Sequence, residues 1–76
     1  MEELYEVLES LHLDADFRNE KHLIDDGILE SLDIVIVVDE LMCHYDITIT
    51  VEDLIPENFN SAEAIYELVQ RLQDEA

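Results

Sequence analysis

The sequence predicts an all-α fold, a small antiparallel bundle of three main helices and one short helix. Of the 76 residues, 49% are hydrophobic, which is enough for one modest core. A single proline and a single glycine leave few of the turn signals on which a β-fold depends. Apolar residues also recur at helical spacing in three separate segments. We therefore expect residues 1–76 to form one domain.

The first predicted helix runs from Met1 to His12 and is followed by a long loop over residues 13–30. A loop of this length without structure of its own is uncommon, and such loops often carry function. The helix has one apolar face with members at i, i+3, i+4 and i+7, namely Leu4, Val7, Leu8 and Leu11. Apolar side chains expected to tie the loop to the core are Phe17, Leu23, Ile24, Ile28 and Leu29.

The second predicted helix, from about Ser31 to Tyr45, is apolar on two sides. A domain of this size has too few elements to surround a central helix, so we expect the second side to dock partner proteins. A homodimer seam and an incidental apolar surface are the alternatives. The predicted core side consists of Ile34, Val37, Val38, Leu41 and Tyr45. The predicted partner-binding side consists of Leu32, Val35, Ile36, Asp39, Met42 and Cys43, the last as an inert contact residue.

The C-terminal third is predicted to hold the short helix and the last main helix. The short helix covers Val51 to Leu54 or Ile55, and Thr50 with Asp53 gives its start a capping-box pattern. We also expect an extended loop with Ile49 turned inwards, a loop over residues 56–60 held by Phe59, and a final helix capped by Asn60 and ending at about Gln73.

The formal net charge of -18, from 21 acidic and three basic residues, is extreme for this length. Such a charge repels nucleic acid and anionic membranes and favours basic protein surfaces as partners. Self-repulsion also predicts a marginal fold that salt stabilises. One cysteine, an acidic amphipathic N-terminus and no long apolar run indicate a cytoplasmic protein without membrane insertion.

No metal site is expected from the spacing of candidate ligands. If the acidic segment from Asp14 to Asp25 were a calcium loop, Arg18 would occupy a ligand position and Asn19 would replace the turn glycine. The three histidines lack the paired spacing of zinc ligands. We interpret these side chains as solvated charge and surface histidines.

Ser31 stands where the acidic, irregular segment ends and the long apolar segment begins. A serine at such a junction can cap the backbone N–H groups of the helix that it opens. Its hydroxyl would also face solvent at the positive end of the helix dipole, where a phosphodiester is well placed. A plain N-cap is the alternative interpretation.

The stretch from Asp26 to Val35, DGILESLDIV, resembles the phosphopantetheine attachment motif of acyl and peptidyl carrier proteins. The family pattern centres on Asp-Ser-Leu or Asp-Ser-Met, and here Glu30 replaces the aspartate and keeps the carboxylate. The order of the predicted helices is similar to the family's over nearly all the chain. The apolar second helix and the segment Asn58–Ser61 resemble stand-alone aminoacyl or D-alanyl carrier proteins more closely.

This resemblance implies that Ser31 carries a 4′-phosphopantetheine arm derived from coenzyme A, with Glu30, Leu32 and Asp33 around the attachment point. The arm would hold an acyl or aminoacyl group as a thioester. The implied partners are a phosphopantetheinyl transferase, an adenylating ligase or acyltransferase, and downstream biosynthetic enzymes, with the chain as a monomer.

The chain is not expected to be an enzyme, because no base and no His-Asp arrangement accompanies Ser31. An unmodified helical interaction module, which docks partners through the apolar side of the second helix, is the alternative function.

Overall fold

The computed structural model describes residues 2–13 and 15–75, and every regular element in these two ranges is helical. The predicted all-α bundle is therefore confirmed. None of the described helices has the length and apolar character that a membrane crossing requires. The main helices are α1 (Glu2–Glu9), α2 (Ser31–Tyr45) and α4 (Ala62–Glu75), and the short ones are the 3-10 helix η1 (Val51–Asp53) and α3 (Pro56–Phe59).

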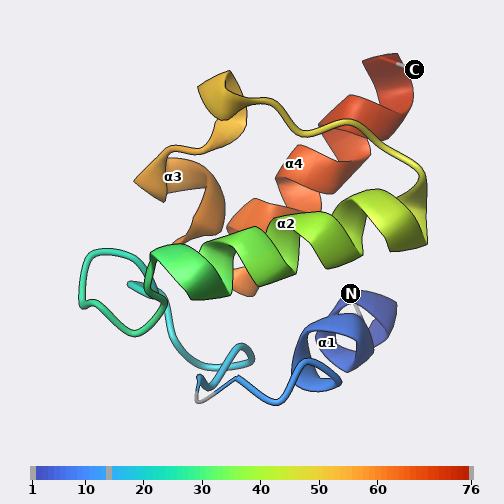
Figure 1. Cartoon of the computed structure of the whole chain (residues 1–76). Coiled ribbons are helices and arrows are strands. Elements are labelled where there is room, and N and C mark those ends of the chain that lie inside the picture. Colours follow the sequence, from blue (N-terminus) through green and yellow to red (C-terminus); the bar gives the residue numbers. More distant parts are fainter. Residues whose placement is uncertain (1, 14, 76) are drawn as a thin grey trace.

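The three main helices each contact the other two and enclose one core. In Figure 1, α2 crosses in front of α4, and α1 lies below them. The predicted core side of α2 is confirmed, because Val37 and Leu41 are buried and the other three members pack partly against the core. Fully buried side chains from the three helices include Leu4, Leu8, Val37, Leu41, Ile65, Leu68 and Val69.

Helix α1 ends at Glu9, three residues before the predicted end. The backbone tightens after it, with the N–H of Leu11 donating to the carbonyl of Leu8 at 3.2 Å. His12 then adopts a φ of 58°, in the left-handed region that ends helical geometry. Met1, the predicted first residue of this helix, lies outside the described residues.

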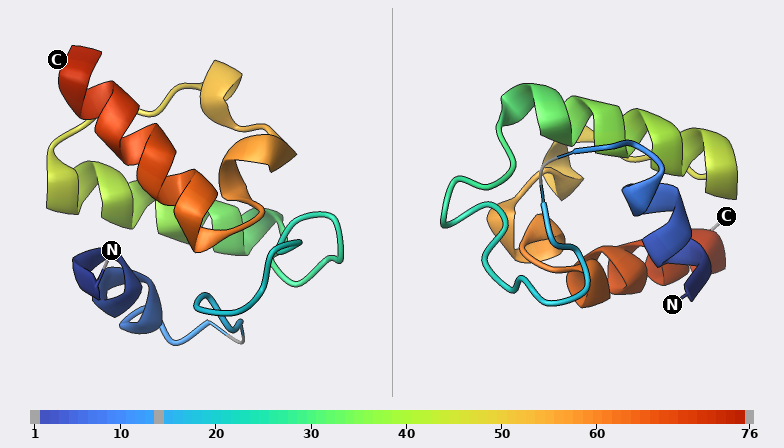
Figure 2. Two further views of the ribbon diagram at one scale, coloured as in Figure 1. Left: turned by 180° about the vertical axis from the view of Figure 1, so that it is seen from behind. Right: turned by 90° about the horizontal axis from the view of Figure 1, so that it is seen from below.

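The loop between α1 and α2 contains no helix or strand in its described residues, as predicted. It runs along one side of the bundle to the start of α2 (Figure 2). Its expected apolar contacts are confirmed: Phe17, Leu23 and Leu29 are buried, and Ile24 and Ile28 pack partly against the core.

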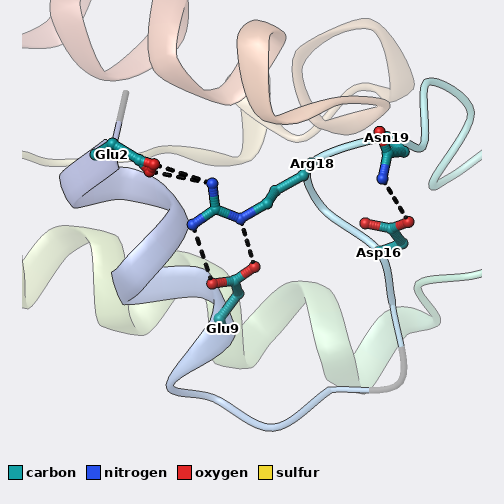
Figure 3. A network of polar contacts seen from close by, with 5 residues as sticks. All are labelled: Glu2, Glu9, Asp16, Arg18 and Asn19. Carbon is teal, nitrogen blue, oxygen red and sulfur yellow. Dashed lines mark hydrogen bonds and ion pairs between the residues drawn. The ribbon is translucent and has the colours of Figure 1, made fainter.

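Arg18 fastens this loop to α1 through two carboxylates, as Figure 3 shows. Its Nη1 lies 2.9 Å from Oε1 of Glu2, and its Nε lies 2.9 Å from Oε2 of Glu9. The guanidinium carbon also lies 4.5 Å from the centre of the Tyr5 ring. The hydrogen bond from Arg18 lowers the pKa of the Glu2 carboxyl. Sequence patterns did not predict this contact, because it joins residues 16 positions apart.

Asn60 fastens the same loop to the junction of α3 and α4. Its Oδ1 accepts hydrogen bonds from the backbone N–H groups of Ile24 and Asp25, both at 3.0 Å. The predicted cap role of Asn60 is therefore wrong. Ser61 caps α4 instead, with its Oγ accepting from the N–H of Ala64 at 3.1 Å. The helix then continues to Glu75, two residues beyond the predicted end.

The segment between α2 and α4 agrees with the predictions in part. The capping pattern is confirmed, because Oδ2 of Asp53 accepts from the backbone N–H of Thr50 at 3.1 Å. Ile49 is buried, as predicted. Residues 56–59 form α3 rather than the predicted loop, because Pro56 occupies the first turn, where its missing N–H removes no helical hydrogen bond.

Candidate functional site

The start of α2 is held by the two carboxylate residues that flank Ser31 and Leu32. Glu30, with extended backbone, is the N-cap residue, and its N–H donates to Oδ2 of Asp33 at 3.2 Å. The carbonyl of Glu30 accepts the first helical hydrogen bond, from the N–H of Ile34 at 3.0 Å. The predicted cap role of Ser31 is therefore wrong: Ser31 is the first residue inside the helix, and Glu30 with Asp33 supplies the capping.

The Ser31 side chain is exposed at the positive end of a 15-residue helix. The structure records no hydrogen bond between its hydroxyl and residues 2–13 or 15–75. The chain just before it is firmly placed, because Leu29 is buried and its N–H donates to the carbonyl of Leu23 at 2.9 Å. The result is an accessible hydroxyl on a well-held backbone.

The charge around this hydroxyl is acidic. Glu30 is exposed and Asp33 is partly buried. Within the described ranges, neither carboxylate forms an ion pair, because the basic residues Arg18, Lys21 and Arg71 pair with other acids. An enzyme that approaches the start of α2 therefore meets uncompensated negative charge, which favours a basic contact surface.

Beyond Ser31, α2 presents a strip of exposed apolar side chains. The exposed fractions are 76% for Leu32, 62% for Val35 and 43% for Ile36. Asp39 and Cys43 are exposed further along the helix, as expected. Met42 differs from the expectation, because it follows Val38 by one helical turn and packs partly against the core with it.

A groove runs beside this strip, between α2 and the η1–α3 segment. It consists of two adjoining hollows of about 260 and 150 Å³ that share Ile34 and Leu54 in their walls. The first hollow is otherwise lined by Val35, Ile36, Val38, Asp39 and Met42, and the second by Ile24, Ile55, Pro56 and Phe59.

The segment around η1 has exposed apolar residues that sequence reasoning did not assign to the site, and two of them, Leu54 and Ile55, line the groove. Val51 is 83% exposed, Leu54 43% and Ile55 42%. Their i, i+3, i+4 spacing was the available signal, and such spacing by itself predicts only a short helix. We call the exposed large apolar residues on α2 and around η1 the docking face: Leu32, Val35, Ile36, Val51, Leu54 and Ile55.

Comparison with known proteins finds a relative that spans nearly the whole chain. A D-alanyl carrier protein of Lactococcus lactis subsp. lactis (strain IL1403) is 28% identical over 76 residues, which cover 97% of this chain and 96% of the relative. No family model matches the chain, and no solved structure matches it significantly. The end-to-end match and the all-helical fold agree with the resemblance carried by the segment around Ser31. These observations support a distant relationship between this chain and the carrier proteins.

Proposed function

We propose that this chain carries an acyl or aminoacyl group on a 4′-phosphopantetheine arm attached to Oγ of Ser31. The observation that carries this proposal is that residues other than Ser31 cap the start of α2. Glu30 and Asp33 cap the helix, so among the described residues the exposed Ser31 hydroxyl has no hydrogen bond to lose on modification. A serine at the N-cap position, by contrast, uses its side-chain oxygen to accept a hydrogen bond from the second or third helical N–H.

The helix start and the exposure of Ser31 fit the arm. The first backbone N–H groups of a helix have no helical acceptor and favour a phosphate group. Leu32, directly beside the serine, is 76% exposed and available to an enzyme that handles the arm. When bound, the arm supplies a terminal thiol that holds the carried group as a thioester. The protein supplies placement and recognition, and partner enzymes supply the catalytic groups.

We further propose that partner enzymes bind the docking face and the acidic start of α2 together. The proposed partners are a phosphopantetheinyl transferase, an adenylating ligase or acyltransferase, and enzymes that use the loaded chain. The D-alanyl carrier relative and the apolar strip favour an aminoacyl cargo. One core shared by three main helices supports treating residues 1–76 as a single carrier domain.

The test is the intact mass of the chain after incubation with coenzyme A, Mg²⁺ and a promiscuous phosphopantetheinyl transferase. We expect the mass of one arm to be added to the wild type and to Ser61→Ala, and nothing to be added to Ser31→Ala. Ser61→Ala is the matched control, because it removes a serine hydroxyl at another helix start.

No added mass on a folded sample, with this transferase and with one from the same organism as the chain, would contradict the proposal. The exposed strip on α2 would then favour the alternative function, an unmodified module that binds partners through its docking face.

A further inference from the structure

Glu20, His22 and Asp26 bring three potential metal ligands together in the loop between α1 and α2. One donor atom from each side chain lies within 4.8 Å of the other two. We propose that these residues bind a divalent transition-metal ion, for which Zn²⁺ is the probe. This site is separate from Ser31 and goes beyond the carrier function proposed above.

Backbone hydrogen bonds explain why the three side chains converge. The N–H of Asp26 donates to the carbonyl of His22 at 2.8 Å, which closes a turn that places these residues side by side. Oε1 of Glu20 accepts from the N–H groups of Lys21 and His22, at 3.1 and 3.2 Å. These bonds orient the Glu20 carboxylate towards the same turn. Gly27, with a φ of 71°, lets the chain leave the turn.

The turn is fixed to the rest of the fold. Leu23, between the ligands, is completely buried, and its N–H donates to the carbonyl of Asn60 at 2.9 Å. The side chain of Asn60 binds the next two backbone N–H groups. The three donors are therefore positioned by the folded core, which lowers the entropy cost of gathering them around an ion.

The local charge favours a cation. Lys21, the basic residue inside this segment, pairs with Glu63 on α4 and does not neutralise its neighbours. In the part of the chain that the structure describes, neither Glu20 nor Asp26 forms an ion pair. Two unpaired carboxylates in a chain of net charge -18 attract divalent cations.

The donor set selects the class of metal ion. Ca²⁺ and Mg²⁺ prefer oxygen ligands only, whereas an imidazole nitrogen suits zinc and other first-row transition ions. Zinc is commonly held by three protein ligands, with water in the fourth position. Residue spacing alone did not predict this site. The site contains a single histidine, and its third ligand, Asp26, follows the buried Leu23 in the sequence.

The test is calorimetric titration with Zn²⁺ of the 76-residue chain carrying Cys43→Ser, which removes the exposed thiol as a competing zinc ligand. In this background we compare His22→Gln with the matched control His44→Gln, and circular dichroism verifies the fold of both. We expect one bound ion in the parent, a loss of affinity of about tenfold or more in His22→Gln, and unchanged affinity in His44→Gln.

Equal zinc affinity in the parent and in His22→Gln would overturn the site. Equal losses in both histidine variants would overturn it as well, because they would indicate diffuse binding to an acidic surface. Glu20→Gln and Asp26→Asn should each weaken binding in the same titration, and unchanged affinity in both would exclude the carboxylates as ligands.

Discussion

At the scale of single residues, capping at the start of α2 falls to Glu30 and Asp33 rather than to Ser31. We expect Asp33→Ala to lower the free energy of unfolding by about 0.3–1.5 kcal/mol, because it removes the acceptor of the Glu30 N–H. Ser31→Ala should change it by less than about 0.5 kcal/mol, since the Ser31 hydroxyl forms no hydrogen bond with residues 2–13 or 15–75. Urea unfolding of the unmodified proteins measures both, and the reverse ranking would identify Ser31 as the cap.

Asn60 is the second residue with a specific structural task. We expect Asn60→Ala to lower the free energy of unfolding by about 1–3 kcal/mol, because the N–H groups of Ile24 and Asp25 lose their acceptor. Hydrogen exchange at these two amides should accelerate. Asn19→Ala is the control and should cost little, because among the described residues the Asn19 side chain bonds only to the nearby Asp16 (Figure 3). Similar costs for both variants would contradict this role.

The sequence located these residues but not all of their roles. Ser31 was correctly placed at the start of α2. Glu30, Ser31 and Asp33 all carry side-chain oxygens, however, and any of them could have capped this helix. Likewise, Asn60 and Ser61 are both competent caps for α4. The choice at α4 depends on the backbone of Ile24 and Asp25, about 35 positions away, and local patterns carry no information about such partners.

At the scale of secondary-structure elements, the main helices could be predicted because each buries a regular apolar stripe. Helix α3 was missed for a physical reason: four residues cannot show a period, and Pro56 ends or begins a helix with equal ease. The exposed apolar residues of α2 were predicted from residue spacing, but the prediction also included Met42, which packs partly against the core. The opposite wall of the groove depends on how η1 packs beside α2, which periodicity does not specify.

The two sides of α2 should respond differently to a negative charge. We expect Val35→Glu to change the free energy of unfolding by less than about 0.5 kcal/mol, because this residue is 62% exposed. The same change should raise KM for the phosphopantetheinyl transferase about tenfold, equivalent to about 1.4 kcal/mol. Met42→Glu should instead destabilise the fold by about 1–3 kcal/mol, because Met42 packs partly against the core.

Gln73→Glu is the control for added charge, since it lies exposed on α4. It should leave both stability and KM unchanged. An unchanged KM for Val35→Glu would exclude this part of α2 from the transferase interface. A loss of helicity in Val35→Glu would show that the strip belongs to the core.

At the scale of the whole molecule, the three basic residues each join two parts of the chain. Arg18 links the long loop to α1, and Lys21 links it to α4. Arg71 links α4 to η1, with a longer separation of 3.9 Å from Asp53. In a molecule of net charge -18, these pairs place positive charge between acidic elements that would otherwise repel one another.

This arrangement predicts a pH dependence for the Arg18 contact. The hydrogen bond from Arg18 lowers the pKa of Glu2 in the folded state below its ordinary value of 4.5. The stabilisation is therefore present above pH 4.5 and is lost as the pH falls through the lower, folded-state pKa. We expect the difference in unfolding free energy between wild type and Arg18→Gln to be constant near neutral pH and to shrink well below pH 4.5.

Acid also relieves repulsion among the other carboxylates, but it does so in both proteins, so the difference between them isolates the Arg18 contact. Thermal or urea unfolding of wild type and Arg18→Gln across the pH range measures this difference in unfolding free energy. A difference that does not change with pH would assign the effect of Arg18 to its packing on the Tyr5 ring instead.

The scarcity of basic side chains has a consequence for proteolysis. Trypsin cleaves after lysine and arginine, so this chain offers it three bonds, and two of them follow Arg18 and Lys21 in the long loop. Cleavage at either bond requires its side chain to leave its carboxylate partner and enter the protease, so the rate reports how often the loop detaches. The rate of cleavage after Arg18 or Lys21 therefore measures how often the loop before Ser31 opens, without any added label. Each cleavage gives a pair of fragments whose masses follow from the sequence.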